Sequence, residues 1–327
     1  MKTLFRTLIP LAALTAIAFA EDPWLVFEGK NGPGKGKHVV LISGDEEYRS
    51  EEALPMLGKM LAEKHGFKCT VLFAIDPANG TINPKESTNV PNAAAVDSAD
   101  FLILGLRFRE YADADMKHIV DYVEAGKPLL GMRTSTHAFN YTKNKDSAYA
   151  SWSFNSNGGF GKKVLGETWI NHHGDHGKQS TRGVIEEANK SHPLLTGVSN
   201  VWGPSDVYGV TTLPDDAKVL LRGAVLTGMK PEDKVLEGKK NEPMMPVAWV
   251  RERKSEKGAT QKVICTTMGA ATDFVSPGLA RFVTNCVYWG TGLPVPAKLD
   301  TAPVGKFEPT NFGFDKSKPG VKPADLK

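Results

Sequence analysis

Short apolar segments alternate with segments of helical periodicity between residues 38 and 132, and this alternation limits the folds open to the chain. A buried strand appears in a sequence as a short run of apolar residues, whereas a helix shows apolar residues three or four positions apart. The pattern predicts an α/β fold built on a parallel doubly wound sheet. The first helix is expected to begin near Leu54, because Pro55 follows it. We expect strands at 38–43, 68–75, 99–106 and 128–132, and helices at 54–64 and 113–125.

The alternation loosens after residue 140. Residues 141–180 are rich in glycine, asparagine, serine, tryptophan and histidine, which predicts a long functional loop insertion. Residues 295–327 hold many prolines and lysines without periodicity. We therefore expect one α/β domain over residues 24–293 and an extended tail over 294–327, laid on the surface or partly disordered. Further strands are expected at 183–186, 217–222, 246–250 and 262–268, and a last helix at 278–289.

The N-terminus has the features of an export signal. Lys2 and Arg6 precede an apolar run from Leu8 to Phe19, and Ala18-Phe-Ala20 matches a signal-peptidase cleavage site. The run is too short to span a bilayer as a stable helix. We expect residues 1–20 to be a signal peptide and the mature protein to be periplasmic or secreted. An uncleaved membrane anchor is the alternative.

Charge balance bears on the partners of the mature chain. Removal of residues 1–20 leaves 38 basic and 37 acidic residues, a net charge of about +1. Such a balance argues against nucleic acid or an anionic membrane as a partner. The oligomeric state is left open by the sequence.

Three cysteines, at positions 69, 265 and 286, lie in apolar runs. Three residues do not make a disulfide framework, and apolar surroundings favour buried free thiols. Whether one disulfide forms among Cys69, Cys265 and Cys286 stays open.

Charged residues directly follow three of the expected strands. Glu47 comes after the first strand, Arg107 after the third and Arg133 after the fourth. In open parallel sheets, ligands bind in the crevice beyond the carboxyl ends of the strands. We therefore expect a shared cleft in which Glu47 does acid–base work and the two arginines hold substrate oxygens.

The segment from Glu167 to Gly177 contains four potential ligands or proton carriers: His172, His173, Asp175 and His176. Imidazole suits both metal binding and acid–base chemistry near neutral pH. One interpretation is a polar loop that has no catalytic or ligand-binding role. A second is a divalent metal held by His173, Asp175 and His176, and a third is metal-free catalysis or sugar binding. We expect the loop to fold over the cleft, where His137 would join it.

The end of the fourth strand, Gly131-Met-Arg-Thr-Ser135, resembles the G-x-C-x-G elbow of class I glutamine amidotransferases. Arg133 stands in the position of the nucleophilic cysteine. Arginine stays protonated and has no lone pair to offer, so glutaminase activity is not expected. A nucleophile pair of Ser135 and His137 is conceivable, although Gly-x-Ser-x-Gly is absent.

The chain contains the segment 131–139, Trp152, Gly158-Gly-Phe160, the segment 172–176, Ser191-His-Pro-Leu-Leu195, Asp206-Val-Tyr208, Pro246-Val-Ala-Trp249 and Thr267-Met-Gly-Ala270. Together these short motifs resemble the trehalose-utilisation, or ThuA-like, family. In many relatives a histidine occupies the position of Arg133, and a Gly-His pair that of Gly269-Ala270. The resemblance implies a fold of the class I glutamine amidotransferase-like and flavodoxin-like kind, without the catalytic cysteine. The exported copies of the family resemble proteins of bacterial carbohydrate catabolism.

The resemblance implies a small carbohydrate as the partner. We expect hydrolysis or elimination on a sugar or keto-sugar, and a non-catalytic carbohydrate-binding or scaffold domain is the alternative. The acid–base candidates are His137, His173, His176 and Glu47. The substrate-binding candidates are Arg107, Arg133, Ser135, Trp152, Asp206 and Tyr208, with Trp169 and Trp202 as further aromatic faces.

Overall fold

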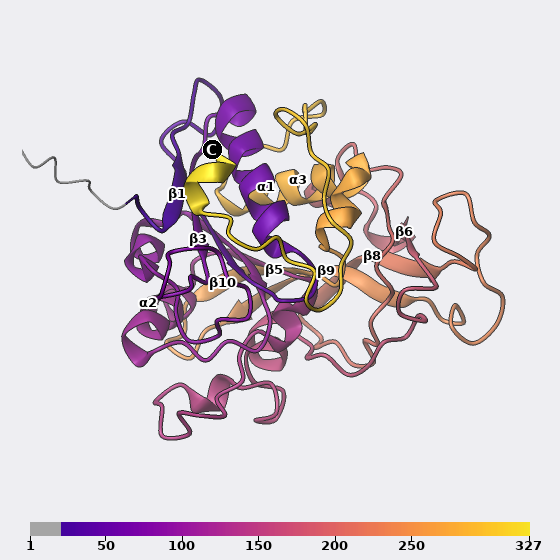
Figure 1. Ribbon diagram of the computed structural model, residues 1–327. Helices are drawn as coiled ribbons and strands as arrows, with labels where there is room; N and C mark the ends of the chain where they lie inside the picture. The colour runs from indigo at the N-terminus through magenta and orange to yellow at the C-terminus, as the bar shows by residue number, and fades with distance from the viewer. Residues whose placement is uncertain (1–20) are drawn as a thin grey trace, which may run out of the picture.

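The computed structural model describes residues 21–327 and has a ten-stranded sheet in the order β1-β3-β2-β4-β5-β10-β9-β8-β6-β7 (Figure 1). The strands are β1 (Trp24–Phe27), β2 (His38–Gly44), β3 (Lys68–Phe73), β4 (Phe101–Leu106), β5 (Leu129–Met132), β6 (Thr181–Ile185), β7 (Trp202–Gly203), β8 (Ala217–Val225), β9 (Met245–Lys254) and β10 (Thr260–Thr266). The helices are α1 (Ser50–His65), α2 (Asp113–Glu124) and α3 (Pro277–Gly290). Short helical turns are η1 (Ala93–Ser98), η2 (Arg133–His137), η3 (Ala150–Trp152), η4 (Gly161–Leu165), η5 (Glu187–Asn189), η6 (Pro193–Leu195), η7 (Ala271–Val275) and η8 (Pro323–Leu326).

The strands expected in the first half of the chain form the parallel part of the sheet. β2 pairs in parallel with β3 on one side and β4 on the other, so that Val39 lies opposite Phe101. β5 joins β4 in parallel, and β10 joins β5. The predicted α/β class and the pairing of the first and third expected strands are therefore confirmed.

The sheet is mixed, so the expectation of a parallel sheet is wrong for its second half. β9 pairs antiparallel with β10, β8 with β9, and β6 with both β8 and β7. For β9 and β10 the cause is the length of their connection, because a parallel crossover needs a dozen or more residues. Only residues 255–259 separate β9 from β10, since β9 continues to Lys254, beyond its expected end at residue 250. β1, which we did not anticipate, adds an antiparallel edge beside β3.

Two apolar cores lie on the two faces of the sheet. Val39 and Leu41 of β2 belong to the core that α1 and α3 cover, whereas Val40 and Ile42 belong to the core that α2 covers. Alternate residues of a strand point to opposite faces, so a strand that is apolar throughout can be buried on both sides. With both faces of the sheet covered, polar groups of the parallel half are left to the ends of its strands.

Helix α1 begins at Ser50, four residues before the expected start. Pro55 lies inside the helix and removes only one backbone donor, while Ala53, Leu54 and Leu57 are fully buried beneath it. Tertiary burial of this face therefore outweighs the local cost of the proline.

All three cysteines are buried free thiols, as expected from their apolar runs. Burial raises the pKa of Cys69, Cys265 and Cys286. Within residues 21–327, no helix has the length and apolar character needed to cross a membrane. The predicted signal peptide lies outside the described residues.

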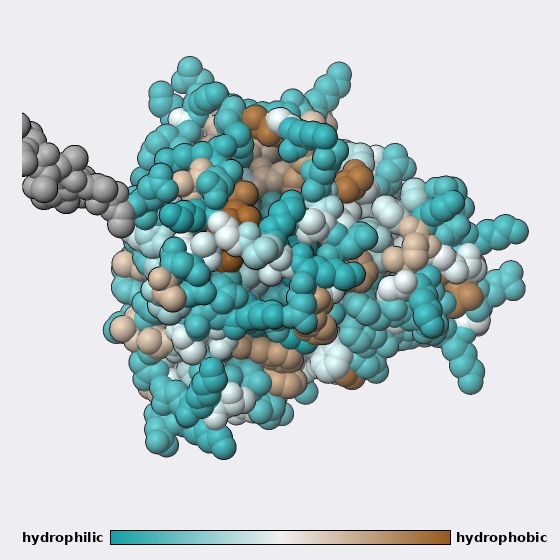
Figure 2. Space-filling view, in the orientation of Figure 1, coloured by the Kyte–Doolittle hydropathy of each residue, from teal (hydrophilic) through white to brown (hydrophobic). Residues whose placement is uncertain are grey.

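The tail after residue 293 runs back over the parallel half of the sheet, and its last turn, η8, lies beside β1 (Figure 1). Phe307, Val321 and Leu326 pack against the core under α1 and α3, and the Ile82 amide donates to the Val321 carbonyl at 2.8 Å. Figure 2 shows this face of the molecule as mainly hydrophilic, with apolar patches that are separate and small. The tail is thus laid along the surface by specific contacts.

Candidate functional site

The carboxyl ends of β2, β4 and β5 bring Glu47, Arg107 and Arg133 to one side of the sheet. Arg107 Nε lies 3.4 Å from Glu47 Oε2, and Glu47 Oε1 lies 3.6 Å from His176 Nε2. His176 is in turn bonded to Asp206, the partner of Arg133. The three side chains that were expected to share a cleft therefore belong to one connected group of charged side chains.

Arg133 occupies a strained turn between β5 and η2. Its φ is 45°, in the left-handed region that a non-glycine residue rarely adopts, so the elbow geometry is present without a nucleophile. Arg133 Nη1 donates to the carbonyls of Asp206 at 2.6 Å and Thr267 at 2.7 Å. Its Nη2 donates to Tyr48 Oη at 3.0 Å and Asp206 Oδ1 at 2.8 Å.

The guanidinium of Arg133 is enclosed by aromatic rings. Its central carbon lies 4.3 Å from the centre of the Tyr48 ring and 3.9 Å from that of Tyr208. Arg133 is buried behind Asp206 with both terminal nitrogens bonded to protein groups. The expectation that Arg133 holds substrate oxygens therefore does not fit this placement, and the residue anchors the site instead.

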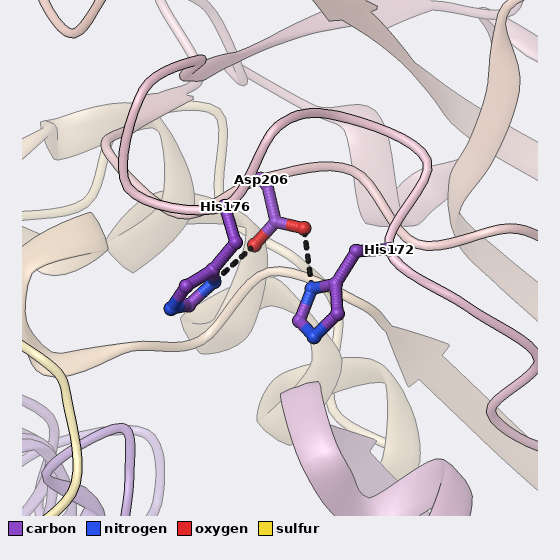
Figure 3. A group of neighbouring side chains, drawn as sticks. All are labelled: His172, His176 and Asp206. Atoms are coloured by element: carbon purple, nitrogen blue, oxygen red, sulfur yellow. Dashed lines mark hydrogen bonds and ion pairs between the residues drawn. The ribbon is translucent and has the colours of Figure 1, made fainter.

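Asp206 is the shared acceptor of the site, and its side chain has no exposed surface. Oδ2 accepts from His172 Nδ1 at 2.7 Å, and Oδ1 accepts from His176 Nδ1 at 3.1 Å (Figure 3). Burial alone would raise the pKa of Asp206, but the Arg133 guanidinium and the two imidazole donors hold it well below its usual range. Asp206 is therefore an anion that fixes both rings.

The shared acceptor determines which ring nitrogen each histidine presents. A histidine that donates its Nδ1 hydrogen to a carboxylate keeps Nε2 as the free nitrogen. The two imidazole rings lie on opposite sides of Asp206 in Figure 3, and 36% of the surface of each histidine side chain is exposed. The Nε2 atoms of His172 and His176 thus face away from the Asp206 carboxylate, on side chains that are partly exposed.

His176 and Glu47 form a pair that can share a proton. The hydrogen bond to Asp206 raises the pKa of His176, although partial burial opposes it. Burial raises the pKa of Glu47, while the nearby Arg107 guanidinium lowers it by a smaller amount. The 3.6 Å separation of Glu47 Oε1 and His176 Nε2 places one more carboxylate at the open nitrogen.

His137 lies beneath this group rather than in its hydrogen-bonded part. The centre of its ring is 4.9 Å from that of Phe108, 5.6 Å from Trp169 and 6.2 Å from Tyr208. Burial, with help from Arg107 and Arg133, lowers the pKa of His137 well below its usual range. His137 is therefore a neutral member of an aromatic floor.

His173 and Asp175 do not reach the cleft, which corrects the predicted metal set. His173 Nε2 bonds to the Lys240 carbonyl at 2.8 Å, and the Lys240 ammonium pairs with Asp175 at 2.5 Å. Neighbouring residues of an extended segment point to opposite sides. The bridge between His172 and Tyr208 fixes the segment so that His172, not His173, faces Asp206.

Two expected substrate contacts also lie outside the cleft. Ser135 Oγ donates to the Leu104 carbonyl at 2.7 Å and accepts from the Leu106 amide at 3.2 Å, so it fastens the end of β4. Trp152 stacks on Phe160 with ring centres 5.6 Å apart. The tryptophan beside the site is Trp169, whose ring centre lies 5.8 Å from that of His172.

Comparisons with known proteins give a match in structure alone: no family model and no curated protein matches the chain. A solved protein from Parabacteroides merdae, provisionally described as ThuA-like, superposes with a TM-score of 0.52 at 11% identity. The match covers 86% of this chain and 98% of that one. The chain has a ThuA-like fold. A second protein so described, from Bacteroides uniformis, has a TM-score of 0.49 at 16% identity over 80% of this chain and 93% of that one.

Within this ThuA-like fold, His172, His176 and Asp206 form a possible three-ligand metal set, with one ligand atom of each within 4.8 Å of the others. A divalent cation there would share Asp206 with the Arg133 guanidinium, which lies 2.8 Å from Oδ1. Two cations that share one carboxylate repel each other where water is excluded. Both Nδ1 atoms already donate to the carboxylate. The arrangement therefore suits a hydrogen-bonded acid–base group better than a metal centre.

Proposed function

We propose that the protein binds a sugar or keto-sugar in this cleft and cleaves it by acid–base elimination. The observation that carries the proposal is the pair of imidazoles held through Nδ1 by one buried carboxylate, so that each Nε2 faces away from it. The ThuA-like fold supports a carbohydrate-related role. Trp169 supplies an aromatic face beside His172.

The two imidazoles can divide the proton transfers of such a reaction. His172 Nε2 takes a proton from the carbon next to the ketone, and the electron pair of that C–H bond forms an enolate. The enolate then expels the β-oxygen substituent, so that a C=C bond forms as the C–O bond breaks. His176, whose pKa is raised, donates the proton that the leaving oxygen needs.

Charged neighbours assist both steps. Arg107 pairs with Glu47 and can stabilise the enolate oxygen. Glu47 lies beside His176 Nε2 and favours the protonated ring that acts as the acid. No water is consumed, and the products are an unsaturated ketone and an alcohol.

Two other reactions fit the site less well. Hydrolysis by two carboxylates needs both groups to reach the substrate, and Asp206 is fully buried and bonded. Glutamine amidotransfer needs a thiolate, whereas the elbow residue is Arg133 and all three thiols are buried. We therefore expect no glutamine hydrolysis that depends on a cysteine.

The test compares three histidine-to-alanine variants on 3-keto-glycosides, with release of the alcohol as the measured rate. His172→Ala and His176→Ala should lower the turnover number by about 100-fold or more, the usual scale of one acid–base group. His173→Ala is the matched control, because its side chain bonds to the Lys240 carbonyl outside the cleft. Equal losses in all three variants would refute the assignment.

Calorimetry on the wild-type protein, together with the rate of alcohol release, separates catalysis from binding alone. If the wild-type protein binds these sugars by calorimetry and releases no product, the protein is a carbohydrate-binding domain. Metal analysis of the same sample, before and after chelation, tests the three-ligand alternative. Turnover that disappears with chelation and returns with one divalent metal would contradict metal-free acid–base catalysis.

A further inference from the structure

The C-terminal tail places two phenylalanines against the candidate site. The ring centre of Phe312 lies 5.2 Å from that of His176 and 5.5 Å from that of Tyr48. Phe314 lies over the Arg107 guanidinium at 5.0 Å, and 52% of its surface is exposed. The tail therefore contacts the acid–base group itself, more than a hundred residues along the chain from its histidines.

The tail is fastened at this point by backbone contacts to the loop that carries Glu47. The Gly313 amide donates to the Glu47 carbonyl at 2.7 Å, and Arg49 Nη2 donates to the Gly313 carbonyl at 3.2 Å. The φ of Gly313 is 131°, a conformation that favours glycine. Thr310 bonds to the Glu52 carboxylate through both its amide and its hydroxyl, each at 2.7 Å.

We propose that Phe312 is a substrate-binding residue that forms an aromatic wall of the sugar site. This inference rests on the proposed function for its ligand and names what the wall recognises, the apolar C–H face of a sugar ring. A sugar presents hydroxyls at its edge and C–H groups on its faces. The site offers the matching pattern, with Glu47 and Arg107 as polar groups and Phe312 as a flat apolar surface.

The position of Phe312 can be tested without a ligand. Its ring packs against the His176 ring and should limit access of a reagent to that imidazole. Diethyl pyrocarbonate acylates unprotonated imidazoles, and peptide mass spectrometry reads the rate at each histidine. Phe312→Ala should raise the rate at His176 several-fold over the wild type. Phe312→Trp should restore the slow rate.

Phe307→Ala is the matched control, since Phe307 belongs to the same tail but packs on the core under α1 and α3. It should leave the rate at His176 unchanged. Circular dichroism and thermal unfolding show whether each variant is folded. If His176 is acylated equally fast in folded Phe312→Ala and in the wild-type protein, the proposal that Phe312 forms a wall beside His176 is refuted.

Calorimetric titration with a 3-keto-glucoside then tests the stacking. Phe312→Ala should weaken binding about 3- to 10-fold, the scale of one aromatic contact, and Phe312→Trp should restore it. If the wild type binds the sugar and Phe312→Ala binds it equally well, the stacking role is refuted while the proposed function stands. If the wild type binds no sugar, the proposed function fails, and the acylation rates still decide whether the wall exists.

Discussion

At the scale of single residues, the site is organised by one buried ion pair. Asp206 neutralises Arg133 and at the same time sets the orientation of His172 and His176. Arg133 needs this partner because a guanidinium that is shut away from water without a counter-charge is very costly. Arg133 and Asp206 therefore form one structural unit that orients the two histidines.

Replacement of Asp206 should cost far more than replacement of an exposed aspartate in the same region. Asp206→Asn breaks the buried pair and should lower the free energy of unfolding by about 3–5 kcal/mol. Asp175→Asn is the matched control, because Asp175 pairs with Lys240 at the surface, and its loss should cost about 1 kcal/mol or less. Urea unfolding of both variants measures the difference, and equal destabilisation would contradict the structural role of Asp206.

At the scale of elements, the first turn of α1 buries charge beside the site. Arg49, with a φ of 61°, precedes the helix, and its Nε lies 3.5 Å from Glu51 Oε1. Neither carboxylate oxygen of Glu51 has a hydrogen-bond partner, and both are buried. Burial, only partly offset by Arg49, raises the pKa of Glu51 from 4.5 to about 7.

This raised pKa predicts a pH dependence of stability. A group that holds its proton more tightly in the folded state contributes stability that is complete below its unfolded pKa and is lost as pH rises through the folded pKa. The free energy of unfolding should therefore fall between pH 4.5 and about 7, by up to about 3 kcal/mol from Glu51. Urea unfolding at pH 5 and pH 8 measures the fall.

Glu51→Gln removes the titrating group and should reduce the difference between the two pH values. Glu63→Gln is the control on the same helix, since Glu63 pairs with Lys30 at the surface. It should keep the pH dependence of the wild type. An unchanged difference in Glu51→Gln would show that other groups cause the effect.

At the scale of the whole molecule, the site is assembled from parts of the chain that are far apart. Strand ends supply Glu47 and Arg107, the long loop insertion supplies His172 and His176, and the tail supplies Phe312. Since the parallel half of the sheet buries both faces, its strand ends are where these segments can meet. The tail is thus an integral part of the fold around the site.

We propose that the whole protein works outside the cytoplasm, in keeping with the signal features of residues 1–20. When the full sequence is expressed in a Gram-negative host, the product should appear in the periplasmic or secreted fraction with Glu21 at its N-terminus. Intact-mass analysis of the fractions checks this. A cytoplasmic product that begins at Met1 would contradict it, and a membrane-bound one would favour the uncleaved anchor.

Local pattern was sufficient for the elements and for part of the site. Apolar periodicity predicted the strands of the parallel half and the three long helices, because burial of a strand or a helix face leaves a regular trace in the sequence. It also predicted that Glu47 and Arg107 would lie near one another, since parallel strands end at the same edge. The elbow at Arg133 followed from its place directly after a strand.

Tertiary structure alone decided the contacts that make the site specific. Whether His172 or His173 faces the cleft depends on the pairing of that segment with Tyr208, and a shift of one residue reverses it. The antiparallel pairing of β9 with β10 depended on where β9 ends. Phe312 left no local signal, because its role comes from a tail that returns across the molecule. Periodicity records how much of each residue is buried, whereas partners distant in the chain are fixed only when the segments pack together.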